Sequence, residues 1–488
     1  MGTAETLRAV QLSHSAQEPP LCVDLDGTLV KTDTLVESLL LLLKTKPFNL
    51  FLLPLWLLKG KAHLKRQVAS VVNLDVASLP YNSELLRYLI EEHRNGRQIV
   101  LATAAEANVA NRIAEHVGVF SAVLATDGAQ NCSGAGKLLK IREHLGPSGF
   151  VYAGNGRVDL PIWRSCKDAI LVNAQNGLVR TVRNIANVRH IVGEKKLTIR
   201  LLIRAVRVHQ WVKNALIFLP LLASHQLSDP IRIVASLWAF AAFCLCCSSA
   251  YIINDLLDLE ADRRHPSKKH RPFASGDLPL ALGLLAAPLL FLGGLALSFL
   301  LPLFFTLTLC VYFVLTLGYS VWIKRLVMLD VIVLALLYTI RVIAGGVAAD
   351  IQISNWLFVF SMFLFLSLAL LKRYSELHVV VSQAKEADKS RGYWTADIEQ
   401  LSSMGSASGY MTALVLALYI NSEDVKPLYA HPQFLWLICP LILYWISRAW
   451  LIARRGAMDD DPVVFAIKDK ASYAVAFLAA IIIAVATG

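Results

Sequence analysis

The sequence predicts two domains of different fold class, an N-terminal α/β domain with a small helical cap and a C-terminal all-α polytopic membrane domain of about nine transmembrane helices. Composition supports the membrane domain, because 56% of the 488 residues are hydrophobic and the mean hydropathy is +0.53. Short strand-like and helix-like segments alternate before residue 173, which is typical of a parallel sheet covered by helices on both faces. We therefore divide the chain into residues 1–190, a basic connector over 191–211 and a membrane domain over 212–488.

Net charge, cysteine content and the N-terminal residues indicate which partners the protein binds and in which compartment its N-terminal domain lies. We attribute the net charge of +11 to loops that face anionic lipid, since no basic–aromatic repeat or glycine-rich module favours nucleic acid as a partner. Three of the eight cysteines, Cys244, Cys246 and Cys247, lie inside an apolar segment, where free thiols behave as small hydrophobic side chains, which disfavours a thiol metal or redox site. Residues 1–20 lack the apolar core of a cleavable signal peptide, so we expect the N-terminal domain to stay in the cytosol.

A short buried-strand pattern over residues 21–29 breaks into a turn at Gly27. Asp24 and Asp26 are two positions apart, so their side chains point to the same side at the end of the strand. The backbone amides of the turn can bind a phosphate. The segment resembles the first motif of haloacid-dehalogenase (HAD)-type phosphatases, Asp-x-Asp-Gly-Thr, whose fold is Rossmann-like. The resemblance implies that Asp24 is the nucleophile and Asp26 a general acid/base, with Mg²⁺ offsetting the charge.

The later motifs of the same family follow in order. Thr103 ends the strand 98–103 and matches the second, phosphate-binding motif, and Lys137 matches the third. The segment 152–161 matches the fourth, which implies Asp159 as a further acidic ligand of Mg²⁺ beside Asp24 and Asp26. Asn155, also counted among the substrate-binding residues, stands where the family commonly has an acidic residue. A degenerate phosphatase fold kept for docking or regulation is therefore the alternative.

The other elements of this domain follow from the same alternation. We predict strands and helices over these residues: 98–103, 108–118, 121–126, 137–145, 149–153 and 169–172. Residues 32–80 should form the cap, with two apolar runs, 35–43 and 50–58, each too short to cross a bilayer. These runs either form the core of the cap or lie on the membrane surface with Trp56 at the interface. Residues 173–200 read as a basic connector suited to a surface helix on anionic lipid.

Nine apolar segments follow in the C-terminal part of the chain. They lie near residues 212–228, 231–253, 278–300, 302–320, 328–349, 354–371, 408–421, 433–452 and 471–487. Loops on one side carry 17 Lys and Arg residues, whereas the opposite loops carry only Lys426. The positive-inside rule then predicts an inner (plasma) membrane protein with the N-terminal domain and both active sites on the cytoplasmic side.

A dense acidic stretch follows the second apolar segment. If the helix continues, Asn254, Asp255, Asp258 and Asp262 fall within an arc of about 100°. Such oxygen ligands suit Mg²⁺ shared with substrate phosphates, and nearby cations suit the remaining phosphate oxygens. Those cations are Arg263, Lys268, Lys269 and Arg271.

The pattern Asn-Asp-x-x-Asp-x-x-x-Asp resembles the first acidic motif of the UbiA-type prenyltransferase superfamily. The longer string NDLLDLEADRRHPSKKHRPFASG is most similar to its decaprenyl-phosphate phosphoribosyltransferase branch. Where other members carry a second Asp-rich motif, this chain has Lys372, Arg373, Tyr374 and Glu376, as in that branch. Lys213 and Asn214 resemble the start of the family's first helix. Arg341 lies inside an apolar segment, so we expect it either to bind a phosphate group of a substrate or to take part in helix packing.

The resemblance implies transfer of a 5-phosphoribosyl group from phosphoribosyl diphosphate to a polyprenyl phosphate, with one Mg²⁺ site in each domain. Catalysis would depend on Asp255 and Asp258, and on Asp24 and Asp26 if the phosphatase-like domain removes the 5-phosphate of the lipid-linked product. A prenyl-diphosphate:aromatic acceptor prenyltransferase and a non-catalytic lipid-binding scaffold are the alternatives. The partners are then phosphoribosyl diphosphate, the polyprenyl phosphate and the bilayer. The sequence leaves both a monomer and a homo-oligomer as alternatives.

Overall fold

The computed structural model describes residues 18–127, 131–146, 149–193, 198–382, 392–423, 425, 428–458 and 462–487. It separates into two compact units. The first unit comprises Met1–Val206 with Ile252–Ala287, and the second comprises Arg207–Tyr251 with Pro288–Gly488. The acidic stretch thus belongs to the same unit as the N-terminal domain.

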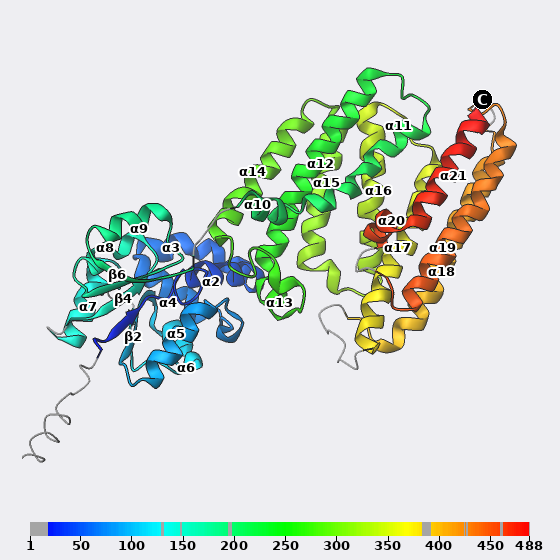
Figure 1. The fold of residues 1–488 in the computed structure, drawn as a ribbon. Coiled ribbons are helices and arrows are strands. Elements are labelled where there is room, and N and C mark those ends of the chain that lie inside the picture. The colour runs from blue at the N-terminus through cyan, green and yellow to red at the C-terminus, as the bar shows by residue number, and fades with distance from the viewer. Residues whose placement is uncertain are drawn as a thin grey trace, which may run out of the picture. The chain divides into compact units, whose positions relative to one another are not determined.

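The first unit contains the predicted parallel sheet (Figure 1). Its six strands are β1 (Leu21–Val23), β2 (Ile99–Glu106), β3 (Ala122–Thr126), β4 (Val151–Gly154), β5 (Asp168–Val172) and β6 (Asn187–Val192). Their order is β3-β2-β1-β4-β5-β6, and every pair is parallel. Since the carboxyl ends of parallel strands meet at one edge, Asp24 after β1, Thr103 in β2 and Asn155 after β4 approach one another there.

Helices cover both faces of this sheet. Residues of α5 (Ser83–Arg94) and α6 (Ala107–Val117) pack with β1 and β2 in one apolar cluster. Residues of α7 (Ala135–Leu145), α8 (Leu160–Trp163) and α9 (Asn176–Arg183) pack on the other face. The helices and strands predicted before residue 173 are thereby confirmed, with their ends shifted by a few residues.

The predicted cap is helical, as expected. It consists of α2 (Thr34–Thr45), η1 (Pro47–Leu52), α3 (Leu53–Leu58), α4 (Lys61–Val71) and the short turn η2 (Val76–Ser78). Leu42, Val68 and Val72 form its small core, against which Leu50, Leu53 and Trp56 pack.

The sequence-based description of residues 173–200 as a connector was wrong for most of that stretch. Residues 176–183 form α9 and residues 187–192 form β6, the edge strand beside β5. The strand carries Arg189 and His190 and exposes most of its side chains, so it lacks the apolar run of an interior strand. Residues 194–197 of the predicted connector lie outside the described residues, and α10 (Ile199–Ala205) follows them.

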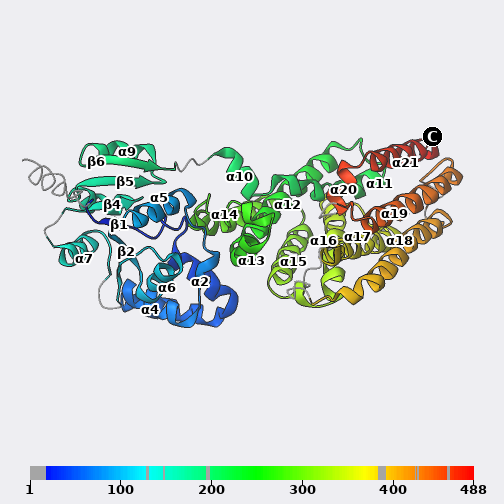
Figure 2. The same ribbon diagram turned by 60° about the horizontal axis from the view of Figure 1, so that its bottom comes forward.

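Eight helices of the described chain are long and apolar enough to cross a membrane. They are α12 (Pro230–Leu257), α14 (Leu280–Ser298), α15 (Leu303–Val321), α16 (Leu329–Ala349), α17 (Asn355–Ser382), α18 (Ile398–Ile420) with the preceding 3-10 turn η8 (Thr395–Asp397), α19 (Ile438–Arg454) with the preceding 3-10 helix η9 (Pro432–Leu437), and α21 (Lys470–Thr487). Figures 1 and 2 show α16 to α19 running side by side. These eight correspond to the last eight predicted segments.

The first predicted segment, residues 212–228, is not a long helix. Its residues form the end of a 3-10 helix, η4 (Val208–Phe218), and the short helix α11 (Leu219–Ala223). The backbone passes so close to α16 that a Cβ on Gly345 would lie 2.0 Å from the carbonyl oxygen of Ile217. Pro220, at the start of α11, lacks an amide hydrogen and so cannot extend η4 as a regular helix.

Candidate active site

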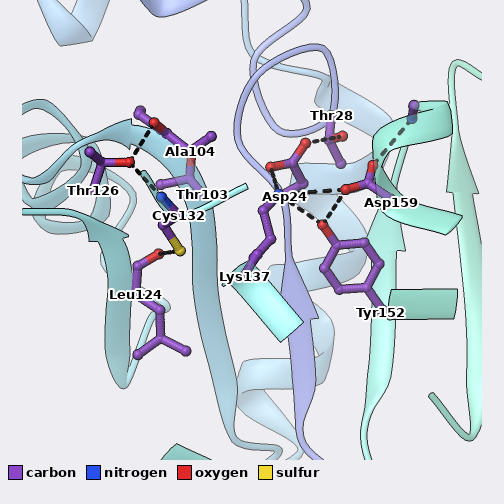
Figure 3. A network of polar contacts seen from close by, with 12 residues as sticks. Asp24, Thr28, Thr103, Ala104, Leu124, Thr126, Cys132, Lys137, Tyr152 and Asp159 are labelled. Atoms are coloured by element: carbon purple, nitrogen blue, oxygen red, sulfur yellow. Dashed lines mark hydrogen bonds and ion pairs between the residues drawn. The ribbon is translucent and has the colours of Figure 1, made fainter. Parts of the chain in front are cut away.

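The C-terminal edge of the sheet gathers three polar side chains, Lys137, Tyr152 and Asp159, around Asp24 (Figure 3). The Lys137 ammonium lies 2.7 Å from Asp24 Oδ1 and 3.5 Å from Asp159 Oδ1. Lys137 also donates to the Tyr152 hydroxyl at 3.0 Å, and that hydroxyl donates to Asp159 Oδ1 at 2.8 Å. All four side chains are buried. Three predicted residues therefore meet in one site, with Tyr152 joining two of them.

Buried charge sets the protonation of this site. Burial raises the pKa of Asp24, and the nearby Asp159 carboxylate raises it further, while the Lys137 ammonium opposes both effects. The two carboxylates raise the pKa of Lys137 against the effect of its burial, which keeps the side chain charged. A charged lysine is what would hold a nucleophilic carboxylate and a substrate phosphate together.

Asp26 has a different environment from Asp24. Its Oδ1 accepts a hydrogen bond from the Thr34 backbone amide at 2.8 Å, at the start of the cap. Burial, with the charge of Asp33 as the next cause, raises the pKa of Asp26 to about 7. Two carboxyl groups two residues apart therefore differ in role: Asp24 is paired with a cation, whereas Asp26 can hold a proton near neutral pH.

Asn155 packs directly against the turn that follows Asp24. A Cβ on Gly27 would lie 2.0 Å from Asn155 Nδ2, and Gly27 has φ +75°. Both observations require glycine there, since the left-handed backbone and the close approach each exclude a side chain. Asn155 thus lies against this turn, while Asp159, four residues later, is the carboxylate that reaches Lys137.

Thr103 and Lys65 lie on the β2 side of the same edge. Thr103 is fully buried, and its hydroxyl oxygen accepts from the Ala105 amide at 2.9 Å. Lys65 on α4 of the cap donates to the Ala104 carbonyl at 2.6 Å and to Asn131 Oδ1 at 3.1 Å. Burial lowers the pKa of Lys65, while Asp26 and Asp33 raise it, so the ammonium feels both acids. The sequence analysis missed Lys65, because no motif marks a cation delivered by a cap.

The donor chemistry of the Asp24 site fits Mg²⁺. Asp24 and Asp159 are buried carboxylates that share one ammonium, so a divalent cation would offset their remaining negative charge. Among the described residues, no three His, Cys, Asp or Glu side chains already converge as a metal site. The residues that could hold the ion are Asp24, Asp159 and Asp26, with Tyr152 as a neighbour.

The acidic stretch of the first unit is interrupted at Asp258, where the sequence analysis expected one helix. Helix α12 ends at Leu257, and α13 (Leu259–Arg264) begins after Asp258. Hydrogen bonds still join the Asp258 amide to the Asn254 carbonyl and the Asp262 amide to the Asp258 carbonyl. Arg271 donates to Asp255 Oδ1 at 3.1 Å and to Asp262 Oδ2 at 2.6 Å.

This arrangement also fits Mg²⁺ and phosphate by its chemistry. Asp255 and Asp262 are buried, and they are joined by a guanidinium that can in turn bind phosphate oxygens. The predicted cations differ in exposure. Lys268 and Lys269 lie on the turn η5 (Lys268–His270), where Lys269 is exposed.

Two predicted site residues of this stretch contact the cap within the first unit. Arg263 forms a bidentate ion pair with Glu37 of α2, and both side chains are buried. Asp258 Oδ1 lies 3.1 Å from the ammonium of Lys44, also on α2. Two further pairs join Arg264 to Asp75 at 2.7 Å and Lys31 to Asp277 at 3.6 Å. Arg263 is therefore held by a carboxylate, which the sequence analysis did not foresee.

In the second unit, Lys213, Asn214 and Arg341 come together. Arg341 donates through Nε to Asn214 Oδ1 at 2.9 Å and through Nη2 to the Tyr312 hydroxyl at 2.7 Å. The Lys213 ammonium and the Arg341 guanidinium both lie over the Tyr338 ring, at 5.8 and 5.4 Å from its centroid. The structure thus groups two buried cations from η4 and α16 around aromatic rings.

The predicted cluster at the end of α17 is mostly occupied by protein contacts. Arg373 is buried between Asp330, Glu376 at 2.6 Å and the Tyr319 hydroxyl. Tyr374 packs edge-on against Trp450 in the apolar core of the second unit. Lys372 is half-buried. Of this cluster, Arg373 is thus held by two carboxylates and Tyr374 by the apolar core.

Comparison with known proteins agrees with both parts of the chain. A family model described as UbiA prenyltransferase family matches residues 215–481, and one described as haloacid dehalogenase-like hydrolase matches residues 21–164. An uncharacterized protein of Sinorhizobium fredii, y4nM, is 36% identical over 97% of this chain and 92% of its own length.

Two further relatives match only part of the chain. A decaprenyl-phosphate phosphoribosyltransferase of Mycolicibacterium smegmatis is 32% identical over 57% of this chain and 89% of its own length. A solved UbiA homolog from Archaeoglobus fulgidus, bound to DMAPP and Mg²⁺, aligns over 58% of this chain and 96% of its own, with 16% identity and a TM-score of 0.44.

Proposed function

Because the chain belongs to the UbiA prenyltransferase family and carries a HAD-like domain, we propose that it transfers a 5-phosphoribosyl group from phosphoribosyl diphosphate to a polyprenyl phosphate. The observation that carries this proposal is Arg271 bound to Asp255 and Asp262, a set of carboxylates and a guanidinium suited to a diphosphate. The identity of 32% to a decaprenyl-phosphate phosphoribosyltransferase supports the choice of donor and acceptor.

In this reaction, a phosphate oxygen of the lipid attacks C1 of the ribose, and the bond from C1 to the diphosphate oxygen breaks. The lipid phosphate is already ionised near neutral pH, so no general base is required. Bound Mg²⁺, held by Asp255, Asp258 and Asp262 with Asn254, would neutralise charge on the leaving diphosphate. Arg271, Lys268 and Lys269 orient the phosphates, and Arg263, paired with Glu37, positions the stretch.

The residues of the second unit take supporting roles in this proposal. Lys213 and Arg341 supply positive charge for a phosphate group of a substrate. Asn214 accepts a hydrogen bond from Arg341 and so orients the guanidinium. The motif of Lys372, Arg373, Tyr374 and Glu376, which resembles the phosphoribosyltransferase branch, supports a contact of Lys372 with the donor. Arg373 is a positioning residue because Asp330 and Glu376 bind it. We assign both active sites to the cytoplasmic face of the plasma membrane, which the 17 cations of one set of loops support.

We propose a second reaction for the N-terminal domain, hydrolysis of the 5-phosphate on the lipid-linked product. Asp24 attacks phosphorus, and Asp26 donates its proton to the departing ribose oxygen. Water then attacks the aspartyl phosphate, loses a proton to Asp26 and releases inorganic phosphate. Lys137, bonded to Asp24 at 2.7 Å, would hold the phosphate beside its attacker.

The test is label transfer by the full chain in lipid bilayers. Radiolabelled phosphoribosyl diphosphate with polyprenyl phosphate should give labelled lipid, whereas labelled prenyl diphosphate with an aromatic acceptor should give none. The opposite result would support the aromatic prenyltransferase, the runner-up in this family. Label in neither product would support the scaffold.

A further inference from the structure

The cap presents apolar side chains to solvent at one place. Along η1 and α3, residues 47–58, six large apolar side chains are exposed, and the four most exposed are Phe48, Phe51, Leu55 and Leu58, at 82%, 80%, 57% and 84%. Their spacing of three and four residues places them on one side of the helical segment. We call this set the cap patch.

The opposite side of the same segment is also apolar. Leu50, Leu53 and Trp56 pack against the small core of the cap. The segment is therefore anchored by one side and leaves the other side uncovered. Single exposed apolar residues are ordinary, but four large ones on one short helical segment mark an interaction surface.

Charge around the cap patch points to an anionic partner. Residues 38–74 contain six cations, Lys44, Lys46, Lys59, Lys61, Lys65 and Arg66, and no Asp or Glu. Lys46 and Lys59 flank the patch in sequence, Lys61 follows, and all three side chains are exposed. Apolar side chains bordered by lysines are the pattern of a segment that lies in the headgroup region of a bilayer.

We propose that the cap patch inserts into the surface of the membrane that the other helices of this chain span. An apolar run of 12 residues is too short to cross a bilayer, so the segment would lie in its surface. The chain already contains eight candidate spans, so a bilayer is present wherever it resides. This inference goes beyond the proposed reactions and does not depend on either of them.

The patch leads directly to the phosphatase-like site. After Lys59 and Gly60, helix α4 begins and carries Lys65, which contacts the Ala104 carbonyl at the edge of the sheet. A membrane-bound cap would therefore place this site beside substrates whose phosphate lies at the lipid surface. The chemical class of such a substrate is a phosphate ester attached to a membrane lipid.

Site-specific photo-crosslinking tests the proposal. The full chain, with p-benzoylphenylalanine at Phe51 in nanodiscs containing phosphatidylglycerol, is irradiated and examined for lipid adducts by mass spectrometry. The matched control places the same residue at Leu139 of α7, an exposed apolar position outside the cap. We expect at least tenfold more lipid adduct at Phe51 than at Leu139.

A second arm tests the role of charge. Lys59→Glu/Lys61→Glu in the Phe51 photo-probe chain, or discs of zwitterionic lipid only, should lower the adduct several-fold. Equal adduct at Phe51 and Leu139 would overturn the proposal, and so would adducts at Phe51 formed with polypeptide, which would indicate a second copy or another protein segment. Neither readout requires an active enzyme.

Discussion

At the residue scale, the most specific expectation concerns Asp26, whose pKa burial raises to about 7. The protonated form, which donates to the leaving oxygen, is present below pH 7 and is lost as pH rises through that value. We expect kcat for an alkyl phosphate to fall about tenfold per pH unit above the pKa. Hydrolysis of p-nitrophenyl phosphate, whose leaving group needs no proton, should stay level over the same range. Parallel profiles for the two substrates would refute this role of Asp26.

Asp255→Asn tests the acidic stretch at the same scale. The buried carboxylate contacts Arg271 at 3.1 Å, and the change removes its charge while keeping its shape. We expect phosphoribosyl transfer to drop by roughly two to three orders of magnitude, since the variant lacks a carboxylate that would hold the Mg²⁺ ion at the leaving diphosphate. Glu260→Gln, on the next turn and paired with Arg264, is the matched control and should retain activity. Full activity of Asp255→Asn would contradict the assignment.

Local motifs predicted these acidic residues because each motif fixes its own strand end or helix end. The grouping of Asp24, Lys137 and Asp159 followed from the parallel sheet, in which such ends share an edge. Lys65 and Glu37 could not be predicted in the same way. Each reaches its partner from the cap, and no sequence spacing encodes that approach.

At the element scale, the contact between α2 and the acidic stretch can be measured. Glu37 and Arg263 are both buried, so removing one partner leaves an uncompensated charge that costs about 3 kcal/mol. We expect Glu37→Gln to lower the local opening free energy of α13, measured by hydrogen exchange, by that amount. The double variant Glu37→Gln/Arg263→Gln should lose less than the sum of the two single changes.

The matched control for this pair is Asp75→Asn. Asp75 pairs with Arg264, whose side chain is 64% exposed, so its loss should cost less than about 1 kcal/mol. Equal effects of Glu37→Gln and Asp75→Asn would mean that the buried pair does not hold the stretch.

Gly345 provides a second test at this scale. A Cβ there would lie 2.0 Å from the Ile217 carbonyl oxygen, so Gly345→Ala must displace η4 from α16. We expect a much lower yield of folded protein in detergent and a lower Tm. Gly293→Ala is the control, because its Cβ would meet only Leu245 Cδ1 at 3.5 Å. A normal Tm for Gly345→Ala would contradict this packing.

The same contact explains why the predicted segment 212–228 is divided between η4 and α11 rather than forming one long α-helix. Apolar composition predicted a span over 212–228. Composition carries no information on the close approach of the Ile217 backbone to Gly345 or on the hydrogen bond between Asn214 and Arg341. The other spans were predicted well, since length and hydropathy alone define them. Strand β6 was missed for the opposite reason, because an exposed edge strand needs no apolar run.

At the scale of the whole molecule, the question is why a UbiA-family domain and a HAD-like domain share one chain. The proposed transferase product keeps a 5-phosphate on its ribose, and phosphate monoesters are what a HAD-type phosphatase hydrolyses. Fusion would raise the effective concentration of that product at the second site, as linked binding sites do. The relative of 32% identity aligns over 89% of its own length with 57% of this chain.

Asp24→Asn should therefore leave phosphoribosyl transfer intact and cause the phosphorylated lipid to accumulate. The variant keeps a side chain of the same shape next to Lys137 but removes the nucleophile. The measurement is the ratio of phosphorylated to dephosphorylated lipid from radiolabelled donor in a single reaction, with Asp168→Asn, an acid of β5 outside the site, as control. Mixing Asp24→Asn chains with Asp255→Asn chains in separate nanodiscs then distinguishes coupling within one chain from transfer between chains. We expect the dephosphorylated lipid to form at least tenfold more slowly in the mixture than in wild type, because the lipid product must leave its disc to reach an active phosphatase. If wild type and Asp24→Asn give the same ratio, the N-terminal domain acts on another substrate.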